Sequence, residues 1–80
     1  MRVAVLGAAH ARDGSFAGAD EVIVLDPSPA ALERLLAEDR DPRFTFLLGE
    51  LPVLPLPDDW VDEVVGADGN DDPELRRVLR

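Results

Sequence analysis

Four short apolar runs recur along the chain, and each is followed by a glycine or an aspartate. The runs are residues 3–6, 21–25, 44–48 and 61–65, and the residues that follow them are Gly7, Asp26, Gly49 and Gly66. The first three runs are apolar at nearly every position, which is typical of strands covered on both faces of a parallel sheet. The fourth carries Asp62 and Glu63 in its middle, so we expect that strand to be more exposed.

The segment between the second and third runs predicts an amphipathic helix. Ser28 is the expected N-cap, and Pro29 fills the first helical position, where its missing N–H is harmless. Apolar residues then recur at i, i+3 and i+4 and should form one buried stripe of Leu32, Leu35 and Leu36. Pro42 is expected to stop the helix before the third strand.

A second helix is predicted at the end of the sequence, where it begins at Pro73 with Asp71 or Asp72 as its cap. Its apolar positions keep the same spacing at Leu75, Val78 and Leu79. Its arginines fall toward the C-terminus, where cations suit the helix dipole. The connection from Ala8 to Asp20 has room for one or two helical turns, and the proline-rich residues 51–59 predict an extended loop.

This alternation of strands and helices predicts an α/β fold, a small three-layer Rossmann-like domain that spans residues 1–80. The order of the sequence motifs, together with right-handed crossovers, predicts about four mainly parallel strands in the spatial order 3-2-1-4. In open sheets of this kind, ligands bind beyond the carboxyl ends of the strands. An acid at the end of the second strand, Asp26, has the spacing expected for a carboxylate that binds ribose hydroxyls. Capping of the following turn explains Asp26 equally well.

The chain holds 17 acidic and 8 basic residues, a formal net charge of −9. This excess of acid excludes nucleic-acid binding driven by phosphate attraction and disfavours an anionic membrane surface. The absence of cysteine excludes disulfides, thiolate metal sites and cysteine nucleophiles. No apolar run has the length of a membrane span and no signal peptide is evident, so we expect a cytoplasmic protein. Like-charge repulsion favours a monomer slightly over a homodimer.

Four segments together resemble the class I S-adenosylmethionine-dependent methyltransferases, in the order in which that family has them. They are residues 3–7 with the first glycine, residues 24–33 with Asp26-Pro27-Ser28-Pro29, residues 48–65, and residues 72–80. The resemblance covers nearly the whole chain but only the first half to two-thirds of the family's domain. It therefore implies a reduced domain without the family's fifth to seventh strands, which build much of the acceptor site.

The resemblance also implies a cofactor cleft for S-adenosylmethionine. Carried over by position, Gly7 would lie at the turn under the methionine part of the cofactor, and Asp26 would bind the ribose hydroxyls. Glu50 would lie near the adenine amino group with Leu51 beside it. Gly66 would end the fourth strand at the methyl-transfer pocket.

The glycine-rich turn of the family is altered here to Gly7-Ala8-Ala9-His10-Ala11. Ala9 is counted with the cofactor-binding residues, although alanine lacks the backbone freedom of glycine. We therefore expect S-adenosylmethionine to bind weakly or not at all, with a dissociation constant no tighter than ~100 µM. The alternative is a non-catalytic interaction or regulatory module that binds a protein partner along the edge strand, residues 61–65.

No catalytic residue is assigned, and the methyl acceptor is not identified. His10 has the intrinsic pKa of a general base, but a surface loop histidine is the favoured interpretation. Trp60 is interpreted as a core anchor rather than a stacking platform. Residues 68–72 resemble a calcium loop, yet Pro73 and Leu79 occupy positions that require glycine and glutamate, so no metal is expected.

Overall fold

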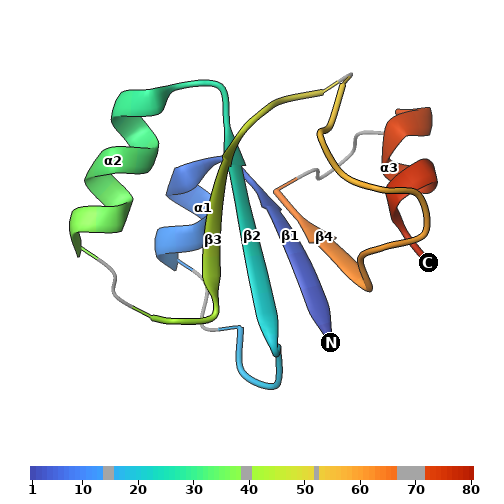
Figure 1. Ribbon diagram of the computed structural model, residues 1–80, viewed down its shortest axis with the longest axis horizontal. Helices are drawn as coiled ribbons and strands as arrows, with labels where there is room; N and C mark the ends of the chain where they lie inside the picture. Colours follow the sequence, from blue (N-terminus) through green and yellow to red (C-terminus); the bar gives the residue numbers. More distant parts are fainter. Residues whose placement is uncertain (14–15, 39–40, 52, 67–71) are drawn as a thin grey trace.

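The computed structural model describes residues 1–13, 16–38, 41–51, 53–66 and 72–80. Its elements in chain order are β1 (Arg2–Leu6), α1 (Ala8–Asp13), β2 (Glu21–Asp26), α2 (Pro29–Glu38), β3 (Phe44–Leu48), β4 (Glu63–Val65) and α3 (Pro73–Val78). The sheet order is β3-β2-β1-β4, and neighbouring strands are parallel (Figure 1). The predicted α/β architecture and strand order are confirmed.

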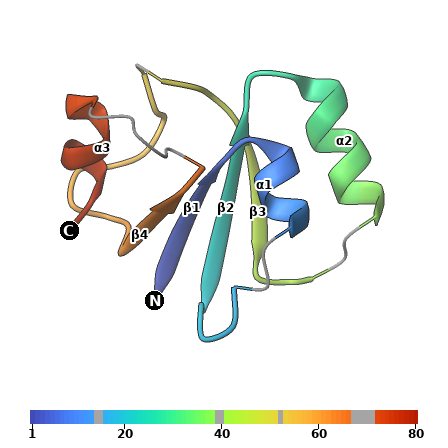
Figure 2. The same cartoon turned by 180° about the vertical axis from the view of Figure 1, so that it is seen from behind.

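Apolar side chains pack on both faces of the sheet. α1 and α2 cover one face and α3 lies on the other side (Figure 2). Successive side chains of a strand point to opposite faces, so Val22 and Val24 join the cluster under α2 while Ile23 and Leu25 join the cluster near α3. This two-sided burial explains why the first two strands read as continuous apolar runs.

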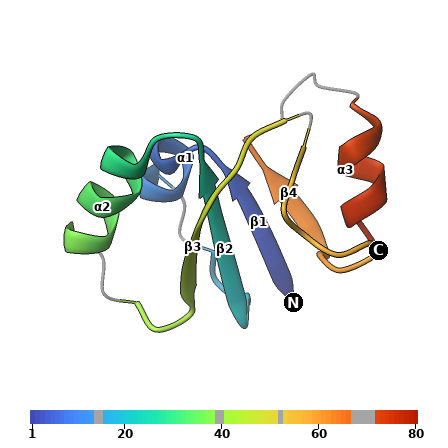
Figure 3. The same ribbon diagram turned by 45° about the horizontal axis from the view of Figure 1, so that its top comes forward.

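The face opposite α1 and α2 is covered in part by a loop. After β3, the chain crosses to the α3 side before it reaches β4 (Figure 3). Leu54 and Leu56 of this crossing are only 3% and 5% exposed, and they pack in one cluster with Leu75 and Val78 of α3. The proline-rich loop therefore takes the place of a helix in this layer.

Local capping chemistry sets the starts of α2 and α3. The Ser28 hydroxyl accepts the N–H of Ala31 at 3.3 Å, and the Asp72 carboxylate accepts the N–H of Glu74 at 2.9 Å. Pro29 and Pro73 are the first residues of the two helices, as predicted. These side chains satisfy N–H groups that have no partner within the helix.

The predicted stripe of α2 is wrong at one position. Leu32 and Leu35 are buried, but Leu36 is 56% exposed. Leu36 lies about 100° around the helix from Leu35. Since Leu35 is the more deeply buried residue, the contact with the sheet centres near it and leaves Leu36 in solvent.

β4 is shorter than the predicted strand at residues 61–65. Val61 is fully buried, and it forms an isolated parallel bridge with Leu79. Its N–H donates to the Val78 carbonyl at 2.9 Å, and its carbonyl accepts the Arg80 N–H at 2.9 Å. The expectation of an exposed edge over residues 61–65 is thus wrong at Val61, because the backbone after α3 pairs with it.

Within the described residues, no helix has both the length and the apolar character that crossing a membrane requires.

Candidate functional site

The carboxyl ends of the strands surround a cavity of about 290 Å³. It is lined by Leu6, Gly7, Leu25, Pro27, Gly49, Glu50, Leu51 and Gly66. Four residues that the sequence assigned to a cofactor are among them, namely Gly7, Glu50, Leu51 and Gly66. The lining is mostly apolar with one carboxylate, and the volume lies near the lower limit of small-molecule sites, about 300–1,000 Å³.

Gly7 forms the turn between β1 and α1. Its φ of 103° is in a region that non-glycine residues rarely adopt. Its N–H donates to the Leu25 carbonyl at 2.7 Å, and its carbonyl accepts the His10 N–H at 3.1 Å. The chain therefore passes from strand to helix within one residue, and the turn stays beside the end of β2.

The Asp26 carboxylate joins the two turns that border the cavity. Its Oδ2 accepts the N–H of Ala8 at 3.0 Å, and its Oδ1 accepts the N–H of Ser28 at 2.8 Å. The capping role considered for Asp26 is present in the structure. Each carboxylate oxygen accepts more than one hydrogen bond, so both oxygens keep capacity for a ligand. Asp26 itself does not line the cavity, whereas the adjacent Pro27 does.

A third wall comes from the segment after β3. The Gly49 N–H donates to the Asp26 carbonyl at 3.3 Å. A Cβ on Gly49 would lie 2.7 Å from Cδ of Pro55, so the proline ring packs directly on the glycine. The Glu50 carbonyl accepts the Val53 N–H at 3.0 Å, which turns the chain back, and the Glu50 side chain is exposed. Leu51 is half-buried against the core cluster of the α3 face.

Gly66 closes the cavity at the end of β4. Its φ is 89°, and a Cβ would lie 2.4 Å from the Leu6 carbonyl oxygen and 2.9 Å from Cδ2 of His10. Glycine is therefore required here for both conformation and space.

The rest of the altered turn, residues 8–11, lies in α1. His10 is exposed on this helix, which corrects its expected place in a loop. Its ring carbon Cδ2 lies against Gly7 and Gly66, at the rim of the cavity. Ala9 is exposed on the same helix and does not line the cavity, although the sequence grouped it with the cofactor-binding residues.

Four lining residues were not assigned to the cofactor from the sequence, namely Leu6, Leu25, Pro27 and Gly49. Their position in the sequence could have indicated this role, because each is at or next to the carboxyl end of a predicted strand. Their apolar character matched a buried strand end equally well, so residue type alone did not mark them as part of a site.

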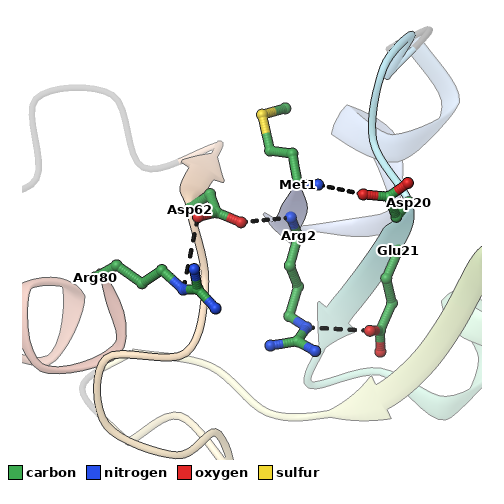
Figure 4. Close-up of a pocket in the computed structure, with 6 residues that line it drawn as sticks. All are labelled: Met1, Arg2, Asp20, Glu21, Asp62 and Arg80. Atoms are coloured by element: carbon green, nitrogen blue, oxygen red, sulfur yellow. Dashed lines mark hydrogen bonds and ion pairs between the residues drawn. The ribbon is translucent and has the colours of Figure 1, made fainter.

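A second cavity, of about 180 Å³, lies at the amino ends of the strands (Figure 4). It is lined by Met1, Arg2, Asp20, Glu21, Asp62 and Arg80. The amino group of Met1 pairs with Asp20, Arg2 Nε lies 3.0 Å from Glu21 Oε2, and Arg80 Nε lies 3.6 Å from Asp62 Oδ1. The three positive groups pair with the three negative groups, and these ion pairs join Met1 and Arg2 to the start of β2 and Arg80 to Asp62.

Hydrogen bonds within this cluster lower the pKa of two carboxylates. The hydrogen bond from the Met1 amino group lowers the pKa of Asp20, and the hydrogen bond from the Arg2 backbone N–H lowers the pKa of Asp62. The Arg2 guanidinium also lies 4.0 Å from the centre of the Trp60 ring. Trp60 is half-buried and packs against the core, in agreement with its predicted role as a core anchor.

Among the residues that the structure describes, no group of three or more His, Asp or Glu side chains is placed to hold a metal ion. The loop that resembles a calcium site, residues 68–72, lies outside the described residues except for Asp72. Asp72 serves as the N-cap of α3.

No protein-family model and no curated protein matches this sequence. Solved structures do match, among them two at 26% identity. One is a complex between the Haloferax volcanii Trm112 methyltransferase activator and a protein assigned as a methyltransferase, with a TM-score of 0.77 over 99% of this chain and 40% of that chain. The other is an S-adenosylmethionine-dependent methyltransferase from Mesorhizobium loti, with a TM-score of 0.72 over 98% of this chain and 41% of that chain. This chain has the methyltransferase fold and spans about two-fifths of each matched chain.

Proposed function

We propose that this chain is a methyltransferase-like domain that binds S-adenosylmethionine in the cavity at the carboxyl ends of its strands. The proposal rests on one observation, that residues assigned separately to the cofactor lie together in the structure. Four residues that the family resemblance assigned from three separate parts of the sequence, Gly7, Glu50, Leu51 and Gly66, line one cavity, in a fold shared with an S-adenosylmethionine-dependent methyltransferase.

The residues present fit the chemical groups of this cofactor. Leu25, Pro27 and Leu51 offer apolar contact surface for an adenine ring. The Glu50 carboxylate is an acceptor for an exocyclic amino group. Asp26 is adjacent to the lining residue Pro27, and its remaining lone pairs are acceptors for a ribose diol that extends past the cavity lining. Gly7 and Gly66 leave the backbone open to close approach.

When bound, the cofactor supplies an activated methyl group on its sulfonium. The contribution of the chain is to bind and orient the cofactor and to keep it against the strand ends, which is the main protein contribution to such a transfer. Ala9 and Ala11 in the altered turn lack the backbone freedom of glycine, and each 1.4 kcal/mol of lost interaction costs about tenfold in affinity. We therefore expect a dissociation constant no tighter than ~100 µM.

The test is a nuclear magnetic resonance titration with S-adenosylmethionine and S-adenosylhomocysteine, with ATP as the control nucleotide. The amides of Gly7, Gly49, Glu50 and Gly66 should shift with the first two ligands and not with ATP. Glu50→Gln should weaken binding, whereas Glu33→Gln on the exposed side of α2 should not. Absence of shifts at these four amides with either ligand would refute the proposal.

A second candidate function is a non-catalytic interaction module that uses the edge of the sheet. Asp62 donates its N–H to the Arg2 carbonyl at 2.8 Å. Alternate residues of a strand turn their backbone groups to opposite sides, so Glu63 and Val65 turn theirs outward, away from β1. Such an edge accepts another strand, and one matched structure is a complex with an activator protein.

The acids at this edge, Asp62 and Glu63, favour a cationic partner strand and disfavour a second copy of the chain. We expect sedimentation at low and moderate salt to give a monomer. A dimer that is stable at low salt and is lost in the Glu63→Pro variant would contradict this expectation and would support pairing between copies.

A further inference from the structure

The loop between β3 and β4 is held in place by two side chains of α3. Glu74 Oε2 accepts the N–H of Leu54 at 2.7 Å. Arg77 donates from Nη2 to the Leu54 carbonyl at 2.9 Å and from Nη1 to the Leu56 carbonyl at 2.7 Å. The two side chains thus bind three backbone groups of the loop, and the Leu54 carbonyl also accepts the Leu56 N–H at 2.8 Å.

Glu74 and Arg77 also bind each other. Arg77 Nε donates to Glu74 Oε1 at 2.5 Å and Nη2 donates to Oε2 at 3.0 Å, a two-point contact. Nη1 donates to Asp58 Oδ1 at 2.7 Å. The hydrogen bond from Arg77 lowers the pKa of Glu74 to about 2, and the bonds to Glu74 and Asp58 raise the pKa of Arg77. The pair is therefore charged throughout the neutral and mildly acidic range.

The loop between β3 and β4 contacts the wall of the cavity through Pro55. This residue lies between Leu54 and Leu56, the two residues whose carbonyls Arg77 binds, and its ring packs on Gly49. Leu54 and Leu56 are almost fully buried in the same cluster as Leu25 and Leu51, which line the cavity. The position of the wall therefore depends on where α3 holds the loop.

We propose that Arg77, together with Glu74, is a positioning residue for the cavity at the carboxyl ends of the strands. By holding Leu54 and Pro55, it sets the positions of Gly49 and Glu50 in the cavity wall. The inference rests on the proposed function only for the identity of the ligand. Coupling of this kind is reciprocal, so a ligand that contacts Glu50 also strengthens the contact between α3 and the loop.

The first experiment compares Arg77→Lys with Arg34→Lys, an exposed arginine on α2. Lysine keeps the charge but cannot form the two-point contact. The affinity for S-adenosylhomocysteine should fall roughly five- to tenfold in Arg77→Lys, within the usual range of coupling between sites, and should be unchanged in Arg34→Lys. Calorimetry is run well below the melting temperature, so that each variant is folded.

Pro55→Ala tests the link without touching Arg77. This variant should also weaken binding, and adding Arg77→Lys to it should have little further effect. A double-mutant cycle of Arg77→Lys with Glu50→Gln should be non-additive, because the arginine acts through the place of the carboxylate. A purely structural role for Arg77 predicts additive effects, and that result would overturn the inference.

A measurement without ligand separates this inference from the proposed function. In Arg77→Lys, the amide resonances and exchange rates of Gly49 and Glu50 should change, whereas those of Ala31 on α2 should not. Failure of the wild-type protein to bind S-adenosylhomocysteine would refute the proposed function alone. Unchanged Gly49 and Glu50 amides in Arg77→Lys would overturn the positioning role.

Discussion

The Oδ2 atom of Asp26 accepts the backbone N–H of Ala8 at 3.0 Å and ties the end of β2 to the first residue of α1. The other oxygen binds the N–H of Ser28, so one carboxylate holds both turns beside the cavity. A structural role and a ligand-binding role for Asp26 are therefore not alternatives. The carboxylate that shapes the turn also keeps lone pairs that can accept further hydrogen bonds, although Asp26 is not among the residues that line the cavity.

Asp26→Asn should destabilise the protein by about 1–2 kcal/mol, because an amide nitrogen cannot accept one of the two backbone N–H bonds. Urea denaturation monitored by circular dichroism measures the change. The control is Glu33→Gln on the exposed surface of α2, which should stay within about 0.5 kcal/mol of the wild type. Equal stability of the two variants would show that the contacts of Asp26 contribute nothing to stability.

Gly66→Ala should be more destabilising than Gly18→Ala, although the two glycines have nearly the same φ, 89° and 88°. Alanine at position 18 meets no atom within 4 Å, so only the backbone strain of about 1–2 kcal/mol applies. At position 66 the new Cβ would also lie 2.4 Å from the Leu6 carbonyl oxygen. Thermal melts of the pair isolate the steric contribution, and equal losses would contradict the close packing of β4 on β1.

Glu74→Gln should make the stability of the fold less dependent on pH in the acidic range. The folded-state pKa of Glu74, about 2, lies below its ordinary value of 4.5. The ionised pair therefore stabilises the fold fully above about pH 5, and this stabilisation is lost as the pH falls through 4.5 toward 2. Urea midpoints measured between pH 7 and pH 2.5 should converge for variant and wild type at the acid end. A difference that stays constant with pH would contradict the assignment.

Val64→Pro should destabilise the sheet far more than Glu63→Pro. The bond from the Asp62 N–H to Arg2 implies that Val64 also turns its N–H toward β1, whereas Glu63 turns its N–H outward. Proline at position 64 therefore removes a bond of the sheet, at a cost of about 1 kcal/mol or more. Urea denaturation compares the two variants, and a larger loss in Glu63→Pro would reverse the inferred orientation of β4.

Several features of this protein follow from local sequence alone. Continuous apolar runs followed by glycine or aspartate predict parallel strands, and the order of the motifs together with the right-handed crossover rule predicts the strand order. Burial on both faces holds for β1 and β2 but not for the edge strand β3, where Leu48 is 57% exposed. Pro29 and Pro73 mark the starts of two helices because capping involves only neighbouring residues. This reasoning brings the carboxyl ends of the strands, and with them Gly7, Glu50 and Gly66, to one edge of the sheet. The assignment of these residues and of Leu51 to a cofactor came from the family resemblance.

Other features were decided only by tertiary packing. Leu36 fits the apolar stripe of its helix as well as Leu35 does, but α2 packs on the sheet through Leu32 and Leu35 and leaves Leu36 exposed. Three further contacts join residues that are distant in the chain. Val61 pairs with the backbone after α3, the ring of Pro55 packs on Gly49, and Arg77 donates hydrogen bonds to the carbonyls of the loop. No periodicity encodes such contacts, because they depend on the path of a loop without regular hydrogen bonds, and that path is set by the elements between which it is packed.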